Sequence, residues 1–126
     1  MKLSEIVDCH RILTSMKQKY YPGPVMFPLI HNLRNLTPVV EDFEQAKNAV
    51  IDKYAKRDEN GNISETANGV LIRDRVGFQN EMNALLNTET NIVFDKVDKD
   101  SLDLCGTSKF DELNMEQRMM IEDFMM

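Results

Sequence analysis

The chain has 126 residues, with 15 Lys and Arg against 21 Asp and Glu, so its formal net charge at pH 7 is −6. This length predicts a single domain over residues 1–126, and a hydrophobic share of 42% is enough to build a core. No apolar run approaches the roughly 18 residues that a membrane-spanning helix needs. The first residues also lack the apolar stretch of a secretory signal. We therefore expect a cytoplasmic protein that has no membrane partner.

Charge is distributed unevenly along the chain. Residues 1–35 carry a net charge of +3, whereas residues 36–126 carry −9. Non-specific nucleic-acid binding depends on Lys and Arg displacing counterions, so direct nucleic-acid binding is not expected from so acidic a chain. Two explanations of the asymmetry remain open. The charges lie on solvated helix faces, or the basic end attracts another subunit or a small anionic ligand.

Apolar spacing predicts a helical hairpin over residues 1–57. Ser4 can cap a helix that begins at Glu5, and this helix should end near Tyr21 because Pro22-Gly23-Pro24 follows. Its apolar residues recur in steps of three and four: Ile6, Cys9, Leu13, Met16 and Tyr20.

A second apolar stripe starts between Val25 and Leu29 and continues to Lys56. Either Thr37 caps a new helix that has Pro38 in its first turn, or one long helix kinks at Pro38. The stripe keeps nearly the same phase on both sides, which favours one long element with a break at Pro38. Such a helix would be about 40 Å long, more than the width of a domain of this size.

Residues 58–73 are rich in turn-forming side chains and should contain a small β-hairpin. Asn68-Gly69 is a strong hairpin signal, with Ile63 in the first strand and Val70-Leu71-Ile72 in the second. The segment Asp58-Glu59-Asn60-Gly61-Asn62 has the composition of a calcium loop. Its glycine stands at position 4 instead of 6, so we expect no metal there.

Residues 74–126 should contain a helix, a short strand and a C-terminal helix. Asp74 can cap the helix, Ile92-Val93-Phe94 is typical of a strand, and Asn114 with Gln117 forms a capping box for the last helix. The predicted fold class is therefore mainly α (α+β). It combines a long antiparallel helical hairpin with a small β-hairpin or strand element and two shorter helices.

Catalytic motifs are absent from the sequence. It has no glycine-rich phosphate loop, nucleophile elbow, zinc-binding helix motif or Cys-x-x-Cys. Cys9 precedes His10, but adjacent side chains on a helix point about 100° apart and cannot act as a nucleophile–base pair. Cys9 also lies on the apolar stripe, which favours a place in the core. We expect no enzymatic activity, no cofactor and no metal.

Basic and aromatic residues gather around the expected turn of the hairpin. His31 and Arg34 are three residues apart and share a helix face. If the two helices pair antiparallel, this group could hold a phosphate-bearing or nucleotide-like ligand, with a ring stacked on an aromatic side chain. The alternative is an ordinary hairpin tip with exposed bases. The members of the group are Lys17, Lys19, Tyr20, Tyr21, His31 and Arg34.

Long helices with continuous apolar stripes expose more apolar surface than one short chain can cover, which predicts a homo-oligomer. Methionine is common on adaptable contact surfaces, so the C-terminal helix is a second candidate interface. Docking of this helix on the core or on a partner subunit is favoured over the alternative, a ligand groove. The expected interface residues are Phe43, Val50, Tyr54, Met119, Met120 and Phe124.

The order of segments resembles a family of small tailed-phage proteins known only as a domain of unknown function. The resemblance covers residues 2–120. It lies in the end of the long helix at Val50–Arg57, the Asp58–Asn62 turn, the helix Phe78–Leu86, the segment Glu89–Phe94 and the final Leu113–Gln117. It implies a phage origin and a site of action in the cytoplasm of a bacterial host. The family carries no assigned activity, so it implies no functional residue.

These observations favour a non-enzymatic phage accessory protein that acts by binding, as a homo-oligomer. Its target would be a host or defence protein, or a small nucleotide-like signal that it sequesters. One alternative is a virion morphogenesis factor, either tail-assembly or capsid-associated. Another is an acidic nucleic-acid mimic, which the net charge of −9 in residues 36–126 supports.

Overall fold

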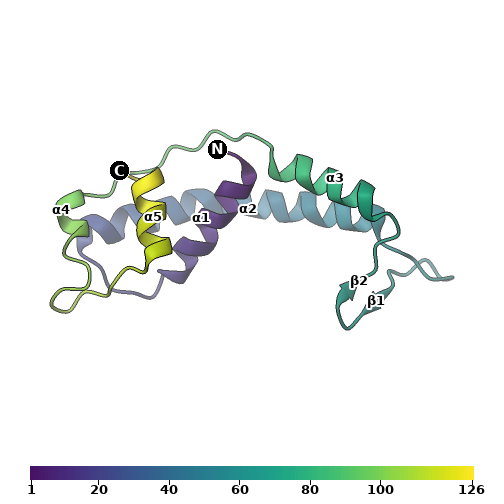
Figure 1. Cartoon of the computed structure of the whole chain (residues 1–126), viewed down its shortest axis with the longest axis horizontal. Helices are drawn as coiled ribbons and strands as arrows, with labels where there is room; N and C mark the ends of the chain where they lie inside the picture. The colour runs from purple at the N-terminus through teal and green to yellow at the C-terminus, as the bar shows by residue number, and fades with distance from the viewer.

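The computed structural model describes all 126 residues and confirms the mainly α class, with 56% of the chain in helices. The molecule is elongated along one long helix, α2 (Figure 1). No helix combines the length and the apolar character needed to cross a membrane. In chain order the elements are α1 (Leu3–Ser15), α2 (Gly23–Tyr54), β1 (Glu65–Thr66), β2 (Gly69–Val70), α3 (Arg75–Leu86), α4 (Lys99–Leu102) and α5 (Met115–Phe124).

The α2 helix is one continuous element of 32 residues, which decides between the one-helix and two-helix alternatives. At 1.5 Å per residue it is about 48 Å long. Pro24 lies in its first turn, while Pro28 and Pro38 lie inside it. Each internal proline lacks the N–H that the helix ladder would use. The helix continues through both because one face is packed along its length, by α1 in the first half and by α3 in the second (Figure 1).

The hydrophobic core lies where α1, the first half of α2 and α5 meet. Its fully buried side chains include Ile6, Val25, Leu36 and Ile121. By contrast, α3 contributes no buried residue, so α3 and the part of α2 beyond Phe43 form a thin two-helix arm. The start of α1 is fixed to the end of α3 by a β-bridge between Lys2 and Glu89 and by a 2.9 Å hydrogen bond from Leu3 N–H to Thr88 O.

The α1 helix differs from the prediction at both ends. It begins at Leu3 with Lys2 as the capping residue, and the Glu5 carboxylate accepts the Lys2 N–H at 2.9 Å. It ends at Ser15, well before Tyr21. Near this end the Ser15 hydroxyl bonds to the Ile12 carbonyl, a local contact that competes with continued helix. Residues 16–22 are therefore a linker, and its two tyrosines have opposite environments: Tyr20 is exposed and Tyr21 is buried.

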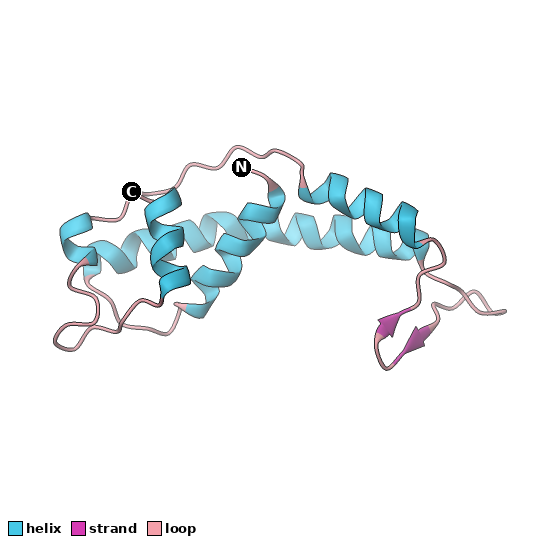
Figure 2. Cartoon of the chain, in the orientation of Figure 1, coloured by secondary structure: helices cyan, strands magenta, loops and turns pink.

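The β-hairpin is confirmed at Asn68-Gly69, but its strands are shorter than expected. Glu65 pairs with Val70 and Thr66 with Gly69, whose φ of +110° suits glycine. Ile63 and Ile72 make isolated bridges to Arg57 and Ala55 instead of extending the hairpin. Figure 2 shows both strands at the end of the molecule farthest from the core.

The prediction of a strand at Ile92-Val93-Phe94 is wrong. The segment has no neighbouring strand, and side chains and the C-terminus satisfy the backbone just after it. The buried Asn32 amide donates to Asp95 O at 3.1 Å and accepts from Asp95 N–H at 2.7 Å. Val97 N–H donates to Met125 O at 2.7 Å. These bonds replace the strand pairing that the sequence suggested.

The caps predicted at Asp74 and Asn114 are confirmed, whereas the one predicted at Ser4 is replaced by Lys2. The Asp74 carboxylate accepts Gly77 N–H at 3.0 Å, and Asn114 and Gln117 bond reciprocally at 3.0 and 2.8 Å. The single-turn helix α4 is capped by Asp98, whose carboxylate accepts the Ser101 N–H at 3.0 Å.

The structure corrects the expected interface set. Phe43 and Met120 are buried in the core of their own chain, which removes them from contact with a second copy. Phe124 packs against Phe94, and the Tyr54 hydroxyl donates to the Glu81 carboxylate at 2.8 Å. Val50 is half-buried in the arm. Met119 is the member of the set that lies exposed, because its neighbours on α5 dock on the core.

Candidate functional site

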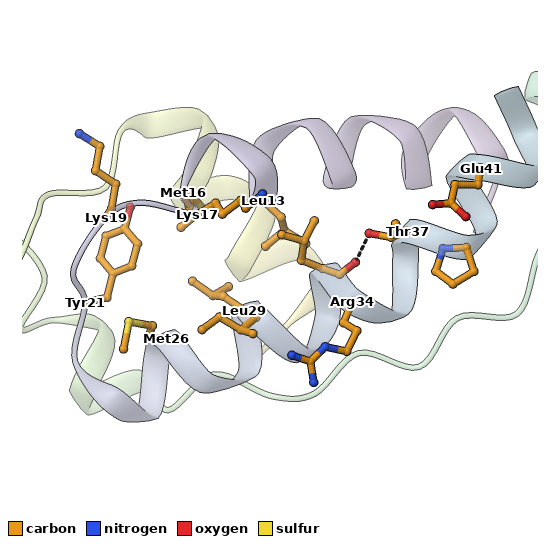
Figure 3. Close-up of a pocket in the computed structure, with 13 residues that line it drawn as sticks. Leu13, Met16, Lys17, Lys19, Tyr21, Met26, Leu29, Arg34, Thr37 and Glu41 are labelled. Carbon is orange, nitrogen blue, oxygen red and sulfur yellow. Dashed lines mark hydrogen bonds between the residues drawn. The ribbon is translucent and has the colours of Figure 1, made fainter.

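A groove with a volume of about 510 Å³ lies between the end of α1, the linker and the first half of α2. It is called the α1–α2 groove below. Figure 3 shows its labelled side chains between the two helices, with Tyr21 at one end and Glu41 at the other. Its volume falls within the range of about 300–1,000 Å³ that is typical of small-molecule sites.

One face of α2 forms a wall of the groove. The contributing residues recur every three or four positions, the spacing that places side chains on a single helix face. From Met26 to Glu41 this wall is about 22 Å long. The members are Met26, Leu29, Ile30, Leu33, Arg34, Thr37, Pro38 and Glu41.

The floor of the groove is aliphatic and thioether in character. Leu13 and Met16 from the α1 side and Leu29 from α2 are buried, and Met26 and Leu33 are half-buried. Ile30 is 48% exposed and forms an accessible part of the lining. The groove therefore offers apolar surface without hydrogen-bonding groups over much of its area.

Three cations surround this apolar floor: Lys17, Lys19 and Arg34. All three are exposed, and none takes part in any ion pair or side-chain hydrogen bond of the chain. Figure 3 shows the Lys19 side chain extending away from the other labelled residues. Lys17 and Arg34 are thus the basic groups placed to meet a ligand in the groove. Glu41 is the one carboxylate in the lining.

Tyr21 contributes a buried hydroxyl to this region. The residue is 2% exposed, and its hydroxyl oxygen is the one buried side-chain polar atom that has no hydrogen-bond partner. Burial raises the pKa of Tyr21 to about 12, with smaller effects from Asp111 and Cys105. The hydroxyl is therefore protonated at neutral pH and can donate a hydrogen bond.

The other hydroxyl in the lining, that of Thr37, is already used within the chain. It donates to the Leu33 carbonyl at 2.9 Å, and the His10 Nε2 atom lies 3.3 Å from it. The one donor of this hydroxyl is therefore used within the chain and cannot bond to a ligand.

The structure brings together four of the six residues expected at the hairpin turn, and separates two. Lys17, Lys19, Tyr21 and Arg34 line the α1–α2 groove. Tyr20 and His31 do not, and each has other partners. Because α1 ends at Ser15, the periodicity that placed Tyr20 on the helix does not apply to it.

The rings of Tyr20 and His31 are engaged elsewhere. The Tyr20 ring stacks on Phe110 with centroids 5.4 Å apart, and the Lys109 amino group lies 5.8 Å from its centre. His31 Nδ1 bonds to the Asp95 carboxylate, and its ring stacks on Phe27. A spacing of three residues leaves His31 and Arg34 about 60° apart around the helix, enough to put them on different sides of the α2 wall.

Sequence reasoning missed the apolar floor. The sequence pattern places Leu13 and Met16 on the apolar stripe of the first helix, and Leu29 and Leu33 fall within the second stripe. The sequence carries no separate signal for the groove, since Met26, Leu29, Ile30 and Leu33 span about 100° of the helix, the ordinary width of a core-facing stripe.

Two other candidates from the sequence, Cys9 as a nucleophile and the Asp58 loop as a calcium site, are not arranged for these roles. Cys9 is 2% exposed in the core, and its pKa is raised to about 12 by burial and then by the nearby charges of Asp8, Glu5 and Asp123. The Asp58 carboxylate accepts the N–H groups of Asn60 and Asn62 at 2.9 and 3.0 Å, which closes its loop as a turn. No group of three or more His, Cys, Asp and Glu side chains is arranged to hold a metal ion.

Comparison of the chain with models of protein families, with curated proteins and with solved structures finds no match. The resemblance to small tailed-phage proteins stays a prediction.

Proposed function

We propose that the chain is a non-enzymatic binding protein that sequesters a small organic anion in the α1–α2 groove. The observation that carries this proposal is an apolar floor flanked by two unpaired cations, Lys17 and Arg34. Small-molecule sites typically combine concave apolar surface with a few polar groups that fix orientation.

Electrostatics supports an anion over a cation or a neutral ligand. The whole chain has a net charge of −6, yet the groove is lined by three basic side chains and one carboxylate. Unpaired cations beside low-dielectric walls concentrate anions locally. Arg34 can also bind a carboxylate or phosphate with two parallel hydrogen bonds, which a lysine cannot copy.

We further propose that the chain is a phage accessory protein that acts by sequestering this ligand. A phage accessory protein that acts by sequestration needs a binding site and no catalytic group, which agrees with the contents of the groove. We also propose that it works as a homo-oligomer, because Met115 and Met119 on α5 are 80% and 54% exposed. Exposed methionines on one helix face are suited to contact with another copy.

The test is a thermal-shift and calorimetric screen of the purified chain with organic anions, including alkyl carboxylates, alkyl phosphates and mono- and cyclic nucleotides. A ligand at a hundred times its dissociation constant should stabilise the fold by about 2.7 kcal/mol, a shift of several degrees. Arg34→Ala should abolish the shift. Arg75→Ala is the matched control, because Arg75 is exposed, forms no ion pair and lies at the start of α3. A screen without any shift would refute the proposal.

A further inference from the structure

We infer that the ligand of the α1–α2 groove is an aliphatic anion, such as a medium- or long-chain carboxylate or an alkyl phosphate. Its chain would lie on the apolar floor and its charged head would meet Lys17 and Arg34. This inference rests on the proposed function and names the chemical class of the ligand. It departs from the nucleotide-like ligand that the sequence suggested.

The floor provides the first argument. The side chains of Leu13, Met16, Met26, Leu29 and Leu33 carry no donor or acceptor suited to a nucleobase. The Thr37 hydroxyl is occupied by the Leu33 carbonyl and by His10. A base laid on this floor would lose water from its N–H and C=O groups and gain no partners, which costs free energy. An alkyl chain has no such groups to satisfy.

The aromatic residues provide the second argument. Recognition of a base by stacking needs an accessible ring face. Tyr20 and His31 have their rings against Phe110 and Phe27, outside the groove. Tyr21 does line the groove but is 2% exposed, so it offers contact at the end of the groove without an open face.

The charges provide the third argument, because along α2 they come after the apolar residues. Along α2, the apolar residues Met26 to Leu33 come first, Arg34 follows, and Glu41 closes the far end. An anionic head is attracted at Arg34 and Lys17 and repelled near Glu41. This order of apolar surface and then cation matches an amphiphile with one charged end.

The experiment is isothermal titration calorimetry of the full chain with decanoate, dodecanoate and dodecyl phosphate, kept below micelle-forming concentrations. Burial of each added methylene should tighten binding about two- to fourfold. Arg34→Ala should weaken dodecanoate binding about tenfold or more, since it removes a charge-assisted contact. Arg75→Ala should leave it unchanged.

A floor variant tests the chain-binding part without endangering the fold. Ile30 is 48% exposed, so Ile30→Ser should preserve the melting temperature and weaken dodecanoate binding severalfold. Val93→Ser is the control, because Val93 is 86% exposed and lies outside the groove lining.

Three probes define the results that would overturn the inference. If AMP or cyclic AMP binds in an Arg34-dependent way and the alkyl anions do not, the ligand class is wrong while the proposed function stands. If dodecyl maltoside, which has a neutral head, binds as tightly as dodecanoate, the negative charge of the head does not contribute to binding and the inference is wrong. If phosphatidylglycerol vesicles bind and monomeric alkyl anions do not, the groove recognises a lipid surface. If no probe binds, the inference and the proposed function both fail.

Discussion

Replacing Tyr21 with Phe should stabilise the free protein. The Tyr21 hydroxyl is buried and has no hydrogen-bond partner, so the folded state bears its desolvation without compensation. An unsatisfied buried group of this kind costs about 1–3 kcal/mol, which Tyr21→Phe should recover because the ring remains in place. For a domain of this length, each kcal/mol raises the melting temperature by about 3–5 °C.

Urea denaturation at neutral pH measures this gain, and Tyr20→Phe is the matched control. Tyr20 is exposed and stacks through its ring, so losing its hydroxyl should leave the free energy of unfolding nearly unchanged. The variant also has a pH signature. Because burial raises the pKa of Tyr21 from 10 to about 12, the unfolded chain loses this proton first and stability falls as pH rises between those values. Tyr21→Phe should remove that part of the alkaline loss. A destabilised Tyr21→Phe would refute the reasoning, since it would mean that the hydroxyl has a partner in solution.

Four further predictions follow. Gly77→Ala should destabilise the protein by about 1–3 kcal/mol in urea despite the better helix propensity of alanine, because the added Cβ would lie 2.5 Å from Asp74 Oδ2 and 2.9 Å from Tyr54 Cε1; a stabilised variant would contradict this packing. Cys9 should resist iodoacetamide at pH 8 until the chain is unfolded, because it is buried and its pKa is about 12; peptide mapping that finds it fully alkylated in the native protein would show that the core opens. Purified protein should contain no stoichiometric zinc or calcium by elemental analysis, and a chelator that lowers its melting temperature by several degrees would reopen the Asp58 loop as a metal site. Light scattering at micromolar concentration should give at least a dimer whose mass falls in Met119→Glu, whereas Phe43→Asp should unfold the chain because Phe43 is in the core; a clean wild-type monomer would exclude the homo-oligomer.

Local signals in the sequence predicted the elements that depend on neighbouring residues. The caps at Asp74 and Asn114 are bonds within one helical turn, and the Asn68-Gly69 hairpin depends on the backbone freedom of Gly69. The long helix could be predicted because its apolar stripe stays in phase across Pro38.

Features that depend on distant contacts could not be predicted in the same way. Ile92-Val93-Phe94 has strand-like composition, but Asn32, more than sixty residues away in the chain, bonds the backbone at Asp95. Likewise, Phe43 and Met120 look like interface residues in the sequence, but the packed helices bury both in the core of their own chain.

The candidate site was predicted in part for the same reason. Lys17, Tyr21 and Arg34 could be grouped because any hairpin turn here brings them near one another. The side chain of Tyr20 points where it does because α1 ends at Ser15, and the ring of His31 is held by Asp95. Sequence spacing contains neither contact, so it placed both residues in the group incorrectly.

The most direct test of the central claim is a two-dimensional ¹H–¹⁵N NMR titration of the chain with monomeric decanoate. Binding in the α1–α2 groove predicts saturable shifts confined to amides of Leu13–Tyr21 and Met26–Glu41, with the shifts lost in Arg34→Ala and kept in Arg75→Ala. Saturable shifts that cluster on α5 or on the α2–α3 arm, or no shifts up to the micelle-forming concentration, would contradict the groove as the binding site.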